Sequence, residues 1–137
     1  YQDDLWARSL ATEFHRMGYR VDTARLVSDM IRRMRNGSTQ VLLLDDELEG
    51  VKACDLVPVL KKINSHVQVI VISSEESLGV ARQLRGAGIF YQAMKPVDFG
   101  ELKSVVESAF RKIQRETIRE GLFSFFMPGT VLSPCDS

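Results

Sequence analysis

The stretch VLLLDDELEG at residues 41–50 runs four apolar residues directly into a group of carboxylates. Its apolar part shows no alternation with polar residues, which is typical of a strand that is covered on both faces. Ligands of an open parallel sheet bind at the carboxyl ends of its strands. We therefore expect Asp45 to lie at such an edge, with Asp46 and Glu47 in the loop that follows.

The rest of the chain alternates between helical and strand-like patterns. Apolar residues recur at helical spacing in five segments, at residues 5–17, 27–34, 56–63, 78–84 and 99–113. Apolar runs of strand character lie between them, at residues 19–24, 40–44, 67–73 and 89–94. This order predicts parallel strands joined by helical crossovers. The expected fold is a doubly wound α/β domain, with helices on both faces of a parallel sheet.

Finer features of the helices also follow from the pattern. We expect Pro58 in the first turn of the third helix, where a proline is tolerated. Asp98 and Glu101 have the spacing of a capping box at the start of the last helix. The apolar residues that we expect on the inward helix faces include Met17, Val59 and Leu78.

Bulk composition restricts the class of protein. The chain has 137 residues, 45% hydrophobic and 26% charged, with a formal net charge of +0. This length suits one domain with one sizeable core.

A neutral chain has no overall field that draws it to nucleic acid or to an anionic membrane. No apolar run approaches the roughly 20 residues of a membrane span, and no export leader is recognised. Cys54 and Cys135 lack the spacing of a disulfide framework or a metal site. We therefore expect a cytoplasmic protein without direct contact to nucleic acid or membrane.

Further polar residues are expected at the same edge as Asp45. Two of the other strand-like segments end at Ser73 and directly before Lys95. Asp3 and Asp4 precede the first helix, where the end of a preceding strand would lie. One edge of the sheet is therefore expected to collect three carboxylates, a hydroxyl and an ammonium group.

Such a set of side chains has a specific chemistry. Three carboxylates at one place repel one another unless a cation lies among them, and Mg²⁺ fits because it takes oxygen ligands from few carboxylates and from water. A carboxylate beside Mg²⁺ can attack a phosphoryl group while lysine and hydroxyl groups stabilise the transferring oxygens. Structural alternatives remain: Asp3 and Asp4 as helix caps, Ser73 as a strand-end cap and Lys95 as a surface lysine.

In their order along the chain, these residues resemble the receiver domain of two-component response regulators. The matching segments are DD at 3–4, LLLD at 42–45, Gly50, VISS at 71–74 and KP at 95–96. Lys95 follows Ser73 by 22 residues and Asp45 by 50 residues, and both spacings suit the family. The resemblance covers residues 1–117. We expect residues 118–137 to be a C-terminal extension, with the end of the last helix and a Phe-rich tail.

The resemblance implies a role for each residue at the edge. Asp45 is implied as the phosphoacceptor, and Ser73 and Lys95 as contacts of the phosphoryl oxygens. The implied ligands of Mg²⁺ are Asp3, Asp4, Asp45 and the main-chain carbonyl of Glu47. The bond between Lys95 and Pro96 is usually cis in the family, and the trans preference of such a bond is small.

The chain departs from the family at several positions. Receivers place their first strand in the interior of the sheet, whereas only Tyr1 and Gln2 precede the acidic pair here. The first central strand is therefore missing, and we expect a short apolar run before Tyr1 in the intact protein. Asp46 stands at a usually apolar position, with a solvated loop carboxylate as its structural alternative. Glu49 replaces a common proline, and Gln92 replaces the aromatic switch residue.

The function implied by the resemblance is a bacterial signalling switch rather than an enzyme. A sensor histidine kinase or a phosphotransfer protein would supply the phosphoryl group, and a downstream protein or a second copy would contact residues 77–115. One alternative is a degenerate receiver that binds partners without taking phosphate. A remote alternative is a haloacid-dehalogenase-like phosphohydrolase, which also uses an aspartate after an apolar strand. That family wants an aspartate where this chain has Glu47.

Overall fold

The computed structural model describes residues 4–35, 39–74, 77–119 and 130–131. Its helices are α1 (Asp4–Arg16), α2 (Val27–Arg35), α3 (Ala53–Ile63), α4 (Leu78–Ala87) and α5 (Phe99–Arg119). The strands of the main sheet are β1 (Arg20–Val21), β2 (Val41–Asp45), β5 (Gln68–Ser73), β6 (Tyr91–Met94) and β7 (Thr130–Val131). A separate antiparallel hairpin consists of β3 (Glu47–Leu48) and β4 (Val51–Lys52).

The main sheet is parallel throughout and has the strand order β1-β7-β2-β5-β6. Its central pair is β2 and β5, which runs in register from Val41 opposite Gln68 to Asp45 opposite Ile72. On the other side of β5, Ser73 lies opposite Met94 of β6. Both pairings bring the carboxyl ends of the strands to one edge of the sheet, as the sequence predicts.

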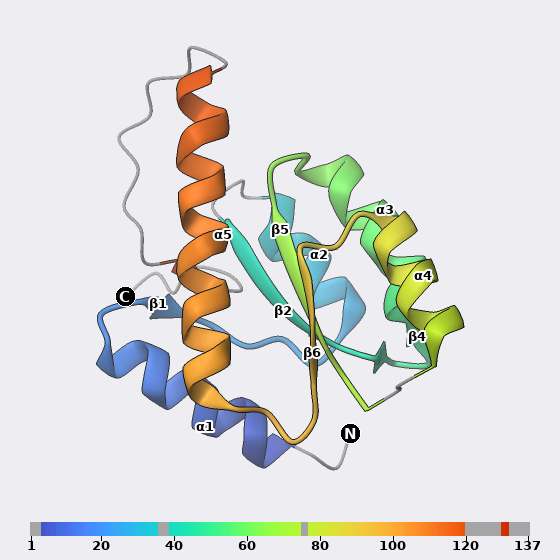
Figure 1. Ribbon diagram of the computed structural model, residues 1–137, viewed down its shortest axis with the longest axis horizontal. Helices are drawn as coiled ribbons and strands as arrows, with labels where there is room; N and C mark the ends of the chain where they lie inside the picture. The colour runs from blue at the N-terminus through green and yellow to red at the C-terminus, as the bar shows by residue number, and fades with distance from the viewer. Residues whose placement is uncertain (1–3, 36–38, 75–76, 120–129, 132–137) are drawn as a thin grey trace.

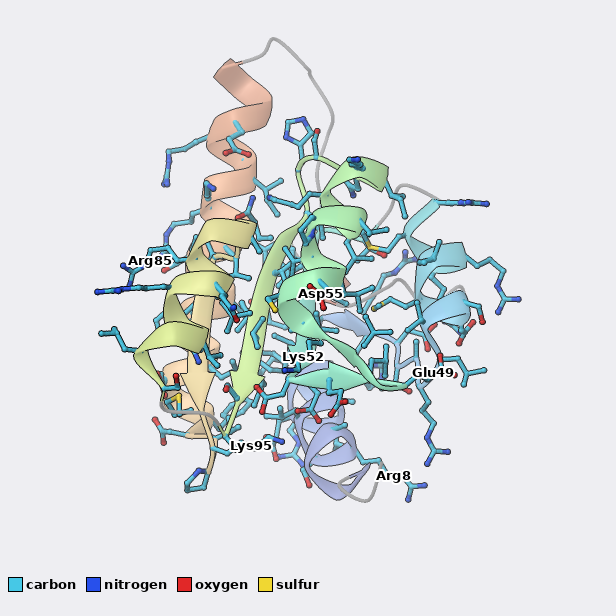
Figure 2. All side chains as sticks on the ribbon, turned by 90° about the vertical axis from the view of Figure 1, so that its right-hand side faces the viewer. Arg8, Glu49, Lys52, Asp55, Arg85 and Lys95 are labelled. Atoms are coloured by element: carbon cyan, nitrogen blue, oxygen red, sulfur yellow. The ribbon has the colours of Figure 1, made fainter. Side chains whose placement is uncertain are left out.

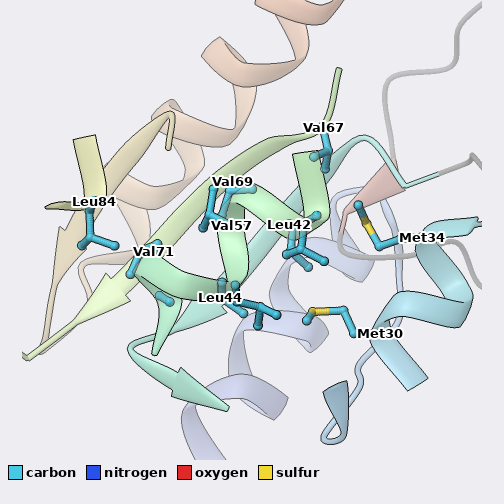
Figure 3. Packing of buried hydrophobic residues seen from close by; sticks show 12 residues of the cluster. Met30, Met34, Leu42, Leu44, Val57, Val67, Val69, Val71 and Leu84 are labelled. Carbon is cyan, nitrogen blue, oxygen red and sulfur yellow. The ribbon is translucent and has the colours of Figure 1, made fainter. Parts of the chain in front are cut away.

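Helices cover both faces of the sheet (Figure 1). Alternate residues of β5 point to opposite faces: Ile70 and Ile72 pack with α1 and α5, whereas Val69 and Val71 pack with α2, α3 and α4. The second of these clusters is drawn in Figure 3, with Leu42 of β2 beside Val69 and with methionines of α2. The predicted doubly wound α/β fold is confirmed, and continuous apolar strands are explained by burial on both faces.

The interior position next to β2 is occupied by the short strand β7, from the far end of the chain. Val131 lies beside Val21 of β1 and beside Val41 of β2, and both pairings are parallel. The sequence suggested that this interior position would lack a strand from within the chain. In the structure, backbone from the C-terminal extension supplies part of it. The remainder of the Phe-rich tail, residues 120–129 and 132–137, lies outside the described residues.

Several predicted details of the helices are wrong. Helix α3 begins at Ala53, and Pro58 therefore lies inside the helix rather than in its first turn. The N–H of Ala53 donates to the carbonyl of Asp46 at 2.8 Å. Met17, Val59 and Leu78 are 38%, 45% and 65% exposed. Met17 lies just after the end of α1, Val59 lies off the inward face of α3, and Leu78 is the first residue of α4. At such positions helical spacing alone predicts burial poorly.

Other predicted details are confirmed. The N–H of Glu101 donates to the side chain of Asp98 at 2.9 Å, which is half of the expected capping box. The peptide bond between Lys95 and Pro96 is cis. Among the described residues, no helix combines the length and apolar character that crossing a membrane requires.

Candidate functional site at the carboxyl edge of the sheet

Asp45 ends β2 at the carboxyl edge of the sheet. Its side chain is 22% exposed, so the carboxylate is held by the fold and still open to solvent on one side. Oδ1 accepts a hydrogen bond from the N–H of Asp46 at 2.7 Å. The apolar residues 41–44 anchor the strand between the two cores, and the chain leaves the sheet at the carboxylate.

Lys95 brings an ammonium group to this carboxylate. It directly follows β6, and its N–H donates to the carbonyl of Ser73 at 2.8 Å, which extends the pairing of β5 and β6. Its Nζ lies 3.1 Å from Oδ1 of Asp45, and its side chain is 23% exposed. Figure 2 shows Lys95 at the end of the sheet where the strands finish. The structure thus joins two predicted site residues that are 50 positions apart.

Ser73 is at the same edge but is oriented differently. It follows Ile72, the partner of Asp45, and is fully buried at 0% exposure. Alternation along β5 places its side chain on the face of Val69 and Val71, whereas Asp45 lies on the face of Leu43. From that face we expect the hydroxyl to point away from the carboxylate of Asp45, so that contact with a group on Asp45 would need a shift at the end of β5.

The predicted metal ligands are only partly within the described structure. Asp3 lies outside it, and the side chain of Asp4 is not described, although its backbone begins α1. Both views place the start of α1 at the end of the molecule where the strands finish (Figures 1 and 2). Glu47 follows Asp45 in the short strand β3, so its carbonyl belongs to the same loop.

Mg²⁺ suits the donors that are present. Asp45 offers a partly exposed carboxylate and the loop offers main-chain carbonyls, which are the hard oxygen ligands that Mg²⁺ prefers. Within the described ranges, no group of three or more histidine, cysteine, aspartate or glutamate side chains converges on a point. The predicted ligands also include Asp3 and Asp4, whose side chains the structure does not describe.

Asp46 has a defined position that the sequence did not reveal. Its Oδ2 accepts two hydrogen bonds from Ser74, one from the backbone N–H at 2.9 Å and one from Oγ at 3.2 Å. Asp46 is thus a half-buried loop carboxylate with a defined partner on another loop. The sequence offered two hints of this contact, namely an acidic residue at a usually apolar position and a second serine after Ser73. These hints do not specify that the two loops meet.

Glu49 connects the loop after Asp45 to the start of α2. Its Oε1 accepts a hydrogen bond from the N–H of Val27 at 2.6 Å, which satisfies one of the free donors at the first turn of that helix. Its backbone is left-handed, with φ of 52°, and Gly50 follows with φ of 79°. The family's usual proline could not adopt this φ, because its ring fixes φ near −65°.

The position expected for an aromatic switch holds Gln92, and its neighbour Tyr91 points outward. Tyr91 is 36% exposed, and its hydroxyl donates to Oε2 of Glu101 on α5 at 2.5 Å. This hydrogen bond is the main cause that raises the pKa of Tyr91 above 10.0, with smaller contributions from burial and from the charge of Glu101. The tyrosine therefore links β6 to α5 rather than to the edge that carries Asp45 and Lys95.

The fold and this edge define a class of protein: a doubly wound α/β domain that presents one aspartate beside one lysine at the carboxyl ends of its strands. The chain matches the family model of the response regulator receiver domain over residues 2–107. It therefore belongs to the response regulator receiver family of two-component systems. This membership favours the receiver over the phosphohydrolase alternative.

Individual relatives agree with this assignment. The chain is 32% identical over 108 residues to the DNA-binding transcriptional regulator NtrC of Azospirillum brasilense, a match that covers 78% of this chain and 22% of that protein. The chain thus spans about a fifth of the length of this curated relative.

Solved structures show the same fold. A CheY-like response regulator receiver domain protein from Methanospirillum hungatei has a TM-score of 0.77 at 20% identity, with 83% of this chain and 91% of that chain covered. A response regulator from Burkholderia pseudomallei, solved with a phosphorylated aspartic acid, a calcium ion and citrate, has a TM-score of 0.70 at 19% identity, covering 86% and 69%.

Proposed function

We propose that this receiver accepts a phosphoryl group on Asp45. The observation that carries the proposal is the contact of Lys95 Nζ with Asp45 Oδ1 at 3.1 Å, at the edge where ligands of parallel sheets bind. An ammonium group in this place neutralises charge that arrives with a phosphoryl donor. The solved Burkholderia relative supports the proposal, because it carries a phosphorylated aspartic acid.

The reaction is an in-line displacement at phosphorus. We assign the attack to Oδ2 of Asp45, since Oδ1 already accepts hydrogen bonds from Lys95 and from the N–H of Asp46. A bond forms between this oxygen and phosphorus, the bond from phosphorus to the donor breaks, and the leaving group departs with the electron pair. Lys95 then holds a phosphoryl oxygen, and Ser73 donates to another once the end of β5 has shifted.

Mg²⁺ belongs to the same proposal. Receiver domains generally bind this ion at the phosphorylation site. In this chain its ligands would be Asp3, Asp4, Asp45 and the carbonyl of Glu47. When bound, the ion neutralises negative charge on the transferring group. The calcium ion of the Burkholderia relative supports a divalent cation in a protein of this family.

A receiver acts through other proteins. We propose that a histidine kinase or a phosphotransfer protein supplies the phosphoryl group, and that a downstream protein or a second copy contacts residues 77–115. The chain is then modified and switched rather than turning over a substrate of its own. The competing function is the degenerate receiver that binds partners without taking phosphate (the silent module), and the following experiment separates the two.

The test is the intact mass of the full chain after incubation with phosphoramidate and Mg²⁺. We expect the addition of one phosphoryl group, which disappears with Asp45→Asn or with excess chelator. Asp46→Asn is the matched control, because it changes the neighbouring carboxylate and should still permit the addition. Absence of any adduct at high donor concentration would favour the silent module.

A further inference from the structure

We propose that Asp46 is a positioning residue: its carboxylate restrains the connection between β5 and α4 through Ser74, and so slows the shift of Ser73 that phosphorylation requires. The inference rests on the proposed phosphorylation of Asp45 and adds a regulatory contact to that site. It concerns the residue next to the phosphoacceptor, at a position where the family resemblance implies an apolar side chain.

The contact joins two segments that border the site from different strands. Oδ2 of Asp46 accepts from the N–H of Ser74 at 2.9 Å and from its Oγ at 3.2 Å. Both bonds end on a charged acceptor, and such hydrogen bonds are stronger than those between neutral groups. The backbone of Asp46 is itself fixed, because its carbonyl accepts from Ala53 and its N–H donates to Asp45.

Because the backbone of Asp46 is held in place, its carboxylate can restrain Ser74. Ser74 directly follows Ser73 at the end of β5. Ser77 is the N-cap of α4, and its Oγ accepts hydrogen bonds from the N–H groups of Gly79 and Val80 at 3.1 and 3.3 Å. Ser74 is thus held by Asp46, and Ser77 is held by its own cap of α4.

The direction of the effect follows from the position of Ser73. Ser73 is fully buried, and alternation along β5 puts it on the face of Val69 and Val71, whereas alternation along β2 puts Asp45 on the face of Leu43. Contact with a phosphoryl group on Asp45 requires the end of β5 to move, and the adjacent Ser74 must then lengthen or exchange its bonds to Asp46. Loss of the Asp46–Ser74 contact should therefore make phosphorylation faster, not slower.

Charge near the site has to be separated from restraint. Asp46→Ala removes both the contact and one negative charge, whereas Ser74→Ala removes the Oγ bond and leaves every charge in place. Glu47→Gln removes one charge from the same loop and leaves Ser74 untouched, so it measures the effect of charge alone on an anionic donor. If the contact restrains Ser74, then Ser74→Ala changes the rate of phosphorylation. If only charge matters, Ser74→Ala leaves that rate unchanged.

The first readout is amide hydrogen exchange by NMR in the unphosphorylated full chain. Asp46→Ala should speed exchange at Ser74 by roughly tenfold or more, as expected for the loss of a hydrogen bond to a charged acceptor, while Val69 and Val71 in the core keep their protection. Unchanged exchange at Ser74 would overturn the contact itself.

The second readout is the rate of phosphorylation by phosphoramidate with Mg²⁺. Ser74→Ala should raise it about twofold to fivefold, a range set by one hydrogen bond, and Asp46→Ala should raise it further than Glu47→Gln does. If Ser74→Ala leaves the rate unchanged and Asp46→Ala only equals Glu47→Gln, restraint plays no part and the inference is overturned. If the unaltered chain takes no phosphoryl group, the proposed function fails, and the regulatory role fails with it; exchange at Ser74 still decides the contact separately.

Discussion

Adjacent aspartates at the end of β2 have different partners, and we expect different roles for them. Asp45 contacts the ammonium group of Lys95, which comes from the end of another strand. Asp46 contacts Ser74 on the connection to α4. The first pair is built into the sheet by parallel register, whereas the second depends on how two loops meet.

Removing the ammonium group tests the site at the level of one residue. We predict that Lys95→Met lowers the rate of phosphorylation by about 100-fold, the usual order for loss of one group that stabilises a transition state. The rate is measured by intact mass over time. Lys103→Met, which removes an exposed lysine of α5, is the control and should leave the rate unchanged. Equal rates for both variants would show that Lys95 takes no part.

The left-handed backbone at Glu49 predicts how this loop tolerates proline. Glu49→Pro, which restores the residue common in the family, should destabilise this chain by about 1–3 kcal/mol, because proline cannot adopt a positive φ. The free energy of unfolding in urea measures the effect. Glu49→Gln keeps an acceptor for the N–H of Val27 and should cost much less. Stabilisation by proline would mean that the loop follows the usual family path.

Sequence patterns predict residues at the ends of regular strands better than contacts between loops. Asp45 and Lys95 were predictable because each directly follows an apolar strand, and parallel register fixes which ends meet. The contacts of Asp46 and Glu49 were not predictable, since each needs a side chain to reach a backbone N–H about 22 to 28 positions away. For Asp3 and Asp4 the prediction of metal ligands stays open.

At the scale of elements, the unusual feature is β7 in the interior of the sheet. Interior strands pair their backbone groups on both sides, and β7 lies between β1 and β2. Helical and strand periodicity predicted the main elements, but a strand of two residues carries no periodic signal. The hairpin of β3 and β4 was missed for the same reason.

The pairing of β7 can be tested through its backbone. Val131→Pro should destabilise the chain by about 1–3 kcal/mol, because it removes a backbone donor within an interior strand. Val131→Thr keeps the donor and the branched shape and should cost less. Denaturant unfolding gives both values. A proline variant as stable as the original chain would show that this strand does not hold the sheet together.

The link between β6 and α5 should respond to pH. The hydrogen bond to Glu101 raises the pKa of Tyr91, so the folded protein favours the protonated phenol. Its contribution to stability is complete below the ordinary pKa of 10.0 and is lost as the pH rises through the higher folded value. We predict that Glu101→Ala lowers the pKa of Tyr91.

Phenolate absorbance during alkaline titration measures this pKa. The signal of Tyr91 is isolated as the difference between spectra of each protein and its Tyr91→Phe counterpart, which is necessary because Tyr19 also titrates with a raised pKa caused mainly by burial. An unchanged titration in Glu101→Ala would contradict the link.

At the scale of the whole molecule, two hydrophobic cores on opposite faces hold the strand ends in place. Phe14 lies in the core between the sheet, α1 and α5, is fully buried, and its ring is 5.2 Å from that of Phe99 and 5.6 Å from that of Tyr19. Phe14→Ala should cost about 3–5 kcal/mol in unfolding free energy. Val59→Ala, at a half-exposed position, should cost less than about 0.5 kcal/mol. Similar costs for both would contradict the assigned layers.

We propose that Asp45, and not the adjacent Asp46, receives the phosphoryl group. The most direct measurement is borohydride reduction of the phosphorylated chain, which converts an aspartyl phosphate to homoserine, followed by peptide sequencing by mass spectrometry. We predict homoserine at position 45 and unmodified aspartate at position 46. Homoserine at position 46, or none at either position in a chain that has gained a phosphoryl group, would contradict it.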